Sequence, residues 1–322
     1  MRRFLKATAG LTLMFALATS GCSAESGSTA STESTTPYAP YVSALTASAT
    51  DTAGSPATYN LAFVIADGSD CTPSWSGVYD VDAARVASRV AELKESGATV
   101  RVSFGGASGD ELAQHCDSAE ALAKAYGDAL DAAGSTQADF DIEGDELTDS
   151  DSVDLRAEAI ALLQRERTGL TVSFTLPVMP AGLDDAGVAL LRSANDHAVQ
   201  VSTVNLMTMN YGESYGGDMG DYALTAAKAA HAQLRDVFGT SSAAAWRGMA
   251  LTSMIGVNDV DGETFTLQDA AQVRRFAERK EIAWVSMWST LRDQECAEGA
   301  DSLTKCSGVK QSSGAFGEAF AG

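Results

Sequence analysis

Eight short apolar segments recur along this chain, and helical patterns separate most of them. Most of the eight are rich in Val, Ile, Leu and Met, which is typical of strands buried on both faces of a parallel sheet. Eight alternations of strand and helix favour a closed (β/α)8 barrel, the TIM barrel, over an open doubly wound sheet. The expected strands are residues 41–45, 60–66, 99–104, 138–142, 170–176, 203–209, 249–255 and 283–288.

The segments between the expected strands carry helix signals, with one exception. Apolar residues at helical spacing follow Asp82, which we expect to be the cap, and end at Gly97. Thr266 followed by Asp269 predicts a capping box. The segment over residues 46–58 is short and rich in Ser, Thr and Gly, so the first helix of the barrel should be short or missing. Further helices are expected over residues 117–134, 152–167, 183–198 and 223–238.

The first 22 residues predict an export signal rather than part of the fold. Two arginines and a lysine precede an apolar run over residues 7–18, which is too short to span a membrane. Gly before Cys22 is similar to a bacterial lipoprotein cleavage site, so we expect a lipid on Cys22 that anchors the chain to the outer face of the cell membrane. Plain secretion is the alternative. Residues 23–37 predict a flexible tether, and residues 38–322 a single domain.

The remaining cysteines form an even set, as expected in an oxidising compartment. Of the three possible pairings we favour Cys296–Cys306, which closes a short loop, with Cys71–Cys116, which joins two loops. A zinc site is the rival, but the chain has no Cys-x-x-Cys pair and its three histidines are isolated. No metal or other cofactor is expected.

The chain is strongly acidic. Its formal charge is −21, and loss of the three positive residues of the signal makes it −24. Such a charge argues against nucleic acid or anionic lipid as a partner and is compatible with a neutral substrate. We expect a monomer whose only link to a membrane is the lipid anchor.

Residues 138–144 read Ala-Asp-Phe-Asp-Ile-Glu-Gly and carry the clearest chemical signal. In an extended strand Asp139, Asp141 and Glu143 face one side, and the two apolar residues between them face the other. Carboxylates about 6–7 Å apart repel one another, so at least one should keep its proton to an unusually high pH. A glycosidase uses such an acid to protonate a leaving oxygen. The alternative is a solvated edge strand in an acidic chain.

Other polar and aromatic residues follow the ends of expected strands, where the chemistry of such a barrel takes place. The third strand ends in Ser103-Phe104-Gly105-Gly106, the sixth in a run from Met207 to Tyr211, and the eighth in Trp288. Together with the acids of the fourth strand, these residues resemble glycoside hydrolase family 18, the chitinases and related endo-β-N-acetylglucosaminidases. The resemblance covers roughly residues 38–322.

The resemblance can be followed motif by motif. The family's strand-four signature, Asp-Gly-x-x-Asp-x-Asp-x-Glu, is matched in its last three acids, whereas Thr136 and Gln137 replace its first Asp-Gly. The Ser-x-Gly-Gly of strand three and the Trp of strand eight are also matched. Strand six departs from the family: where many members have Met-x-Tyr-Asp, this chain has Asn210 in place of the Asp, and Tyr211 comes one place later.

The resemblance implies a retaining mechanism in which the substrate takes part. Glu143 would protonate the glycosidic oxygen while the substrate's 2-acetamido oxygen attacks the anomeric carbon. Asp141 would orient the acetamido group, Asp139 would share a proton with Asp141, and Tyr211 would supply a phenol. Further substrate contacts are expected from Trp288, Met207, Asn210, Ser103, Gly106, Trp75 and Asn258.

The expected activity is therefore hydrolysis of β-1,4-linked N-acetylglucosamine polymers or oligomers. About 27 residues separate the seventh and eighth strands, too few for an inserted domain, so we expect a shallow groove and internal cuts. Two alternatives remain. One is an endo-β-N-acetylglucosaminidase acting on glycoprotein glycans, and the other is a non-catalytic surface lipoprotein that binds chito-oligosaccharides.

Overall fold

A computed structural model describes residues 36–300 and 303–322 of the chain. All eight expected strands are present and parallel to their neighbours in the ring. The export signal, Cys22 and nearly all of the tether lie outside the described residues. The eight strands are β1 (Tyr41–Ser43), β2 (Thr58–Asp67), β5 (Thr99–Gly105), β6 (Gln137–Asp141), β7 (Thr171–Pro177), β8 (Val201–Met207), β9 (Met249–Met254) and β12 (Trp284–Trp288).

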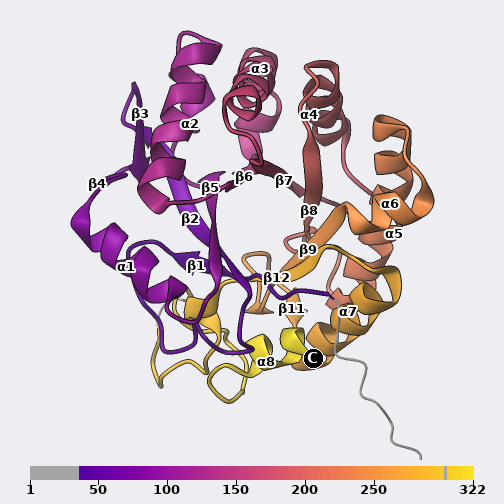
Figure 1. Cartoon of the computed structure of the whole chain (residues 1–322). Coiled ribbons are helices and arrows are strands. Elements are labelled where there is room, and N and C mark those ends of the chain that lie inside the picture. Colours follow the sequence, from indigo (N-terminus) through magenta and orange to yellow (C-terminus); the bar gives the residue numbers. More distant parts are fainter. Residues whose placement is uncertain (1–35, 301–302) are drawn as a thin grey trace, which may run out of the picture. The chain divides into compact units, whose positions relative to one another are not determined.

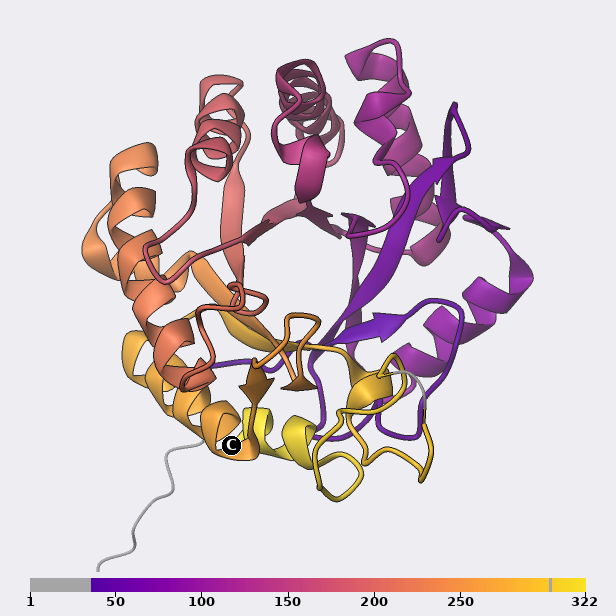
Figure 2. The same ribbon diagram turned by 180° about the vertical axis from the view of Figure 1, so that it is seen from behind.

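The strands follow one another around a barrel, as predicted (Figures 1 and 2). The hydrogen-bonded order runs from β12 through β9, β8, β7, β6 and β5 to β2, and β1 pairs with β2. The two ends of this ladder meet just before β1. There, Tyr38 forms a parallel bridge with Val285 of β12, and the Ala39 amide donates to the Val285 carbonyl.

Helices surround the strands (Figure 1). Between β1 and β2 the described chain has turns in place of a helix, as expected from its Ser, Thr and Gly content. The capping box of Thr266 and Asp269 is confirmed, whereas the prediction for Asp82 is wrong, because the cap is Ala83 and makes no side-chain bond. The helices are α1 (Ala84–Lys94), α2 (Ala119–Ala133), α3 (Ser150–Glu166), α4 (Asp185–Asp196), α5 (Met219–Phe238), α6 (Ser242–Arg247), α7 (Leu267–Lys280) and α8 (Ala315–Ala321).

Short elements decorate the ends of the barrel. After β2 the chain turns back, so that β3 pairs antiparallel with β2 and β4 pairs antiparallel with β3. Three single-turn helices follow strands or precede helices. In the described part of the chain, no helix is both long and apolar enough to cross a membrane. The short elements are β3 (Asp70–Trp75), β4 (Tyr79–Asp80), β10 (Gly256–Val257), β11 (Thr264–Phe265), η1 (Leu112–Gln114), η2 (Gly144–Leu147) and η3 (Thr290–Arg292).

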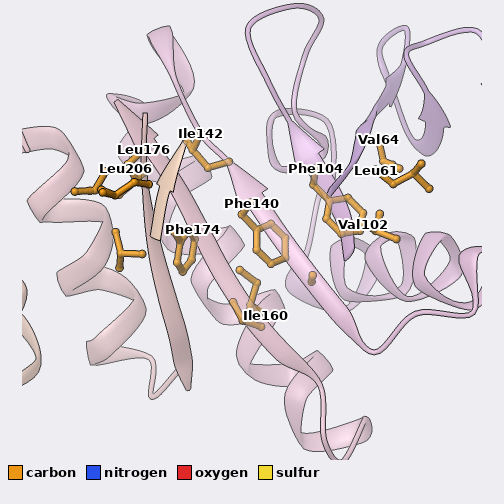
Figure 3. Close-up of a cluster of buried hydrophobic side chains, with 14 of the residues drawn as sticks. Leu61, Val64, Val102, Phe104, Phe140, Ile142, Ile160, Phe174, Leu176 and Leu206 are labelled. Atoms are coloured by element: carbon orange, nitrogen blue, oxygen red, sulfur yellow. The ribbon is translucent and has the colours of Figure 1, made fainter. Parts of the chain in front are cut away.

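The apolar residues of β6 determine which way its acids point. Phe140 is fully buried and packs on Phe104 and Phe174, with ring centroids 5.3 and 5.7 Å away, in the layer that also holds Ile160 of α3 (Figure 3). Burying one such aromatic side chain stabilises a fold by about 1.5–3 kcal/mol. Because side chains alternate along a strand, this packing turns the carboxylates of β6 toward the barrel interior.

Both expected disulfides are confirmed. Cys71 of β3 is bonded to Cys116, so the β3 hairpin is tied to the segment that follows β5. Cys296 is bonded to Cys306 and closes the loop between η3 and α8.

Candidate active site

Asp139 lies inside the barrel, where four hydroxyl groups donate to it. Tyr41 and Ser103 bond its Oδ2 at 2.9 and 2.7 Å, Ser173 bonds Oδ1 at 2.6 Å, and Thr175 reaches both oxygens at 2.9 and 3.1 Å. These donors come from β1, β5 and β7, of which β5 and β7 are the strands hydrogen-bonded to β6. These hydrogen bonds leave the carboxyl group little freedom to move, so the position of Asp139 inside the barrel is fixed.

Asp141 and Glu143 line one cavity above Asp139. Burial raises the pKa of Asp141 well above its usual value, and the nearby charges of Glu143 and Asp139 raise it further. Burial also raises the pKa of Glu143, which is half-buried. The predicted retention of a proton by this run of acids therefore agrees with their environment. Because the charge of Glu143 acts on the pKa of Asp141, the two acids lose their protons in linked steps.

One oxygen of Asp141 has no protein partner. Oδ1 is buried, and no donor within the described residues reaches it. A buried acceptor without a hydrogen bond costs about 1–3 kcal/mol. A ligand N–H or O–H that entered the cavity could remove that cost.

Aromatic side chains form one wall of this cavity, whose volume is about 300 Å³. Trp288 stacks on Phe63 with centroids 5.5 Å apart and meets the edge of Tyr41 at 5.9 Å. An apolar wall beside a few convergent polar groups is typical of a small-molecule site. A second cavity of about 660 Å³ adjoins the first, because the two share lining residues that include Trp288 and Asp259.

The ends of β8 and β9 supply another part of the cavity lining. Met207 and Asn210 line the first cavity, as predicted for substrate contacts. The Nδ2 of Asn210 donates to the Asp259 carboxylate at 3.4 Å, and the Asp259 amide donates to the Asn210 Oδ1 at 3.1 Å. Asn210 thus stands where the Met-x-Tyr-Asp motif has its Asp, and its two hydrogen bonds hold a different acid, Asp259, in the cavity lining.

Two predicted site residues lie away from the cavity. Trp75 is fully buried and donates its indole N–H to the Val81 carbonyl, so it cannot stack on a sugar. Tyr211 is 4% exposed, packs on Tyr215 and Tyr222, and does not line the cavity. The one-place shift of this tyrosine turns its phenol into the helix-side core, and the prediction of a catalytic phenol is corrected accordingly.

Three further predicted contacts shape the site: Ser103 and Gly106 do not line the first cavity, whereas Asn258 lines the second one. Ser103 is fully buried and bonds Asp139. Gly106 donates its amide to the Asp141 carbonyl, and a Cβ there would come within 2.9 Å of the Phe63 ring. Asn258 is 5% exposed and donates to two carbonyls of its own turn, so it shapes the loop after β9. For Ser103 and Gly106 the structure shows a structural role in place of the predicted substrate contact, whereas the predicted contact of Asn258 stays a prediction.

The cavity also contains residues that sequence reasoning missed. Tyr41, Phe63 and Thr175 all line it. Tyr41 and Thr175 lie on expected strands, so the period-two alternation of inward side chains could have identified them. Phe63 carries no such signal, because β2 is irregular near it. Asp259 also lines the cavity, and its place just after the seventh strand does identify it as a candidate for contact with sugar hydroxyls.

Comparisons with known proteins give a consistent picture, although no family model matches the chain. A probable bifunctional chitinase/lysozyme of Escherichia coli strain K12 is 34% identical over 249 residues, or 73% of this chain and 28% of that protein. Endochitinase 11 of Metarhizium anisopliae is 32% identical over 252 residues, or 74% of this chain and 48% of that protein. The match thus spans less than half of either curated relative.

Solved structures match over a larger share of their length. The catalytic domain of a hyperthermophilic chitinase from Pyrococcus furiosus has a TM-score of 0.77 and is 32% identical, covering 88% of this chain and 93% of that one. Three glycoside hydrolase family 18 structures share the fold alone, at 11%, 14% and 15% identity and TM-scores of 0.58, 0.54 and 0.52.

Proposed function

The chain belongs to glycoside hydrolase family 18 as a chitinase-like member, and we propose that it hydrolyses β-1,4-linked N-acetylglucosamine polymers or oligomers. The observation that carries the proposal is the pair of raised-pKa acids, Asp141 and Glu143, in one cavity beside Trp288. Catalytic-site mutants of the Pyrococcus furiosus domain, in complex with chito-oligosaccharides, lend support to this substrate class.

The proposed reaction proceeds in two steps with retention of configuration. Glu143 gives its proton to the glycosidic oxygen as the bond from that oxygen to the anomeric carbon breaks. The substrate's acetamido oxygen forms the new bond to this carbon, which gives an oxazolinium ion. Water then attacks the same carbon and yields its proton to Glu143, so the acetamido group and the enzyme are both regenerated.

Asp141 suits the role of partner for the acetamido group. Its unpaired Oδ1 is a ready acceptor for the acetamido N–H, and a negative charge there would stabilise the oxazolinium ion. Asp139 is held in place by its four hydroxyl donors, and its charge raises the pKa of Asp141. Trp288 offers its ring to the apolar face of the reacting sugar, and Asp259 is within the cavity to accept from a sugar hydroxyl.

We further propose that the chain is exported and acts as a monomer, tethered to the outer face of the membrane by a lipid on Cys22. The amino-terminal sequence supports this localisation through its charged start, short apolar run and Gly-Cys pair. The two disulfides are compatible with an oxidising compartment.

Purified protein should convert N-acetylglucosamine tetramer to hexamer into shorter oligomers, as followed by mass spectrometry. With the hexamer, we expect internal cuts that give trimer as well as dimer and tetramer from the first minutes. A high-mannose glycoprotein in a parallel reaction should keep its glycans. Release of those glycans without oligomer cleavage would favour the endo-β-N-acetylglucosaminidase alternative. Oligomer binding without any cleavage would favour the non-catalytic one.

A further inference from the structure

A buried charge cluster lies directly behind the acids of the cavity. Its centre is Glu111, which precedes η1 and is fully buried. Its Oε2 accepts from the Arg156 guanidinium at 2.8 and 3.0 Å and from the Ala113 amide at 2.9 Å, while its Oε1 accepts from the Tyr126 hydroxyl at 2.5 Å. Glu111 and Arg156 thus form a closely fitted ion pair that joins the segment after β5 to α3.

Glu146 is the second carboxylate of this cluster. Its Oε1 accepts from the Glu111 amide at 2.8 Å, whereas its Oε2 is buried with no hydrogen bond from any described residue. The Arg156 guanidinium bonds Glu111 and acts on Glu146 through its charge. Burial raises the pKa of Glu146 to about 7; the charges of Glu111 and Asp110 add to this rise, while the Glu111 amide and Arg156 oppose it.

Glu146 and the proton donor belong to one turn. Glu143 is the residue that precedes η2, and its side chain makes no capping bond there. Gly144, with φ of 61°, changes the direction of the chain between them. The bond from the Glu111 amide to Glu146 therefore fastens η2 to the segment after β5, three residues beyond Glu143. On the other side, the Gly106 amide holds the Asp141 carbonyl.

We propose that Glu146 is a positioning residue: by fastening η2 to the Glu111–Arg156 pair, it holds Glu143 over the bond to be cleaved. This inference rests on the proposed function. Glu146 also acts on the acids through space, because its charge raises the pKa of Asp141. The groups that face Glu146 are Glu111, Asp110, Arg156, and the acids of the cavity.

Three variants test the role of Glu146. Glu146→Ala removes the acceptor of the Glu111 amide, and we expect kcat on the tetramer to fall about 10- to 100-fold with KM changed by less than about twofold, because a misplaced donor affects the reaction more than binding. Glu146→Gln keeps an oxygen for that amide and should retain kcat within about threefold. Asp145→Ala, on the exposed side of the same turn, is the control and should change neither constant.

The pH profile gives a readout that a purely structural role would not move. Once ionised, Glu146 raises the pKa of Asp141, whose own pKa is raised further by the charge of Glu143, so Glu146→Gln should move the alkaline limb of kcat/KM to lower pH by roughly half a unit, and Asp145→Ala should not. If Glu146→Ala keeps the same kcat as the control variant Asp145→Ala, the proposal is overturned. Should Glu146→Ala fail to fold, an unmoved limb in Glu146→Gln would overturn it. A wild-type protein that cleaves no oligomer would instead refute the proposed function itself.

Discussion

Replacing Glu143 with Gln is expected to lower kcat on chito-oligosaccharides by about 10²–10⁴-fold, the contribution of a well-placed general acid. The amide keeps the size of the side chain, which lines the cavity, but it has no proton to give to the leaving oxygen. Initial rates on the hexamer across the working pH range, measured beside the wild type, provide the test.

The same variant should still bind substrate. The aromatic wall around Trp288 and the free Oδ1 of Asp141 are unchanged by the substitution. Titration calorimetry should therefore detect hexamer binding to the variant. We expect its Kd to lie within about tenfold of the Kd of the wild type for the shorter oligomers that it releases. Asp145→Asn removes an exposed acid two residues away and serves as the control. A Glu143→Gln protein with more than a tenth of wild-type activity would show that the proton comes from another group.

Replacing Asp141 with Asn is expected to lower kcat by about 10²–10³-fold, because the charge that would face the oxazolinium ion is lost. Its effect on pH dependence differs from that of Glu143→Gln. The Glu143 charge raises the pKa of Asp141, and because this repulsion is mutual, an ionised Asp141 helps to keep the proton on Glu143. In Asp141→Asn that effect is lost, and burial alone raises the pKa of Glu143. Glu143 then loses its proton at lower pH, and the alkaline limb of the residual activity should move in that direction.

A rate profile of Asp141→Asn from about pH 4 to 9 measures both effects in one series. An unchanged limb would mean that the two acids do not interact in the working enzyme. A kcat within tenfold of the wild type would remove Asp141 from the reaction. Circular dichroism of the variant checks that the barrel has folded.

Much of the fold can be predicted from the sequence because buried parallel strands are nearly continuous apolar runs. All eight strands were expected within a few residues of their bounds, and the missing first helix followed from its composition. The inward direction of Asp139 and Asp141 follows from the same rule, since Phe140 must face the helices. The two disulfides were also expected as they occur.

The parts that could not be predicted depend on contacts between distant segments. Trp75 lies in a hairpin whose packing, not its composition, decides that the indole is buried. Tyr211 is displaced by a single residue, which is enough to turn its ring away from the cavity. Glu146 joins the site through a hydrogen bond to Glu111, which lies 35 residues away along the chain.

The participation of the substrate's own acetamido group can be tested most directly with two matched hexamers. One is the β-1,4-linked N-acetylglucosamine hexamer, and the other is the fully deacetylated glucosamine hexamer, both incubated with wild-type protein and followed by mass spectrometry. Only the acetylated chain carries the oxygen that attacks the anomeric carbon, so it alone should be cleaved. Comparable cleavage of both chains, or of neither, would contradict the proposed mechanism.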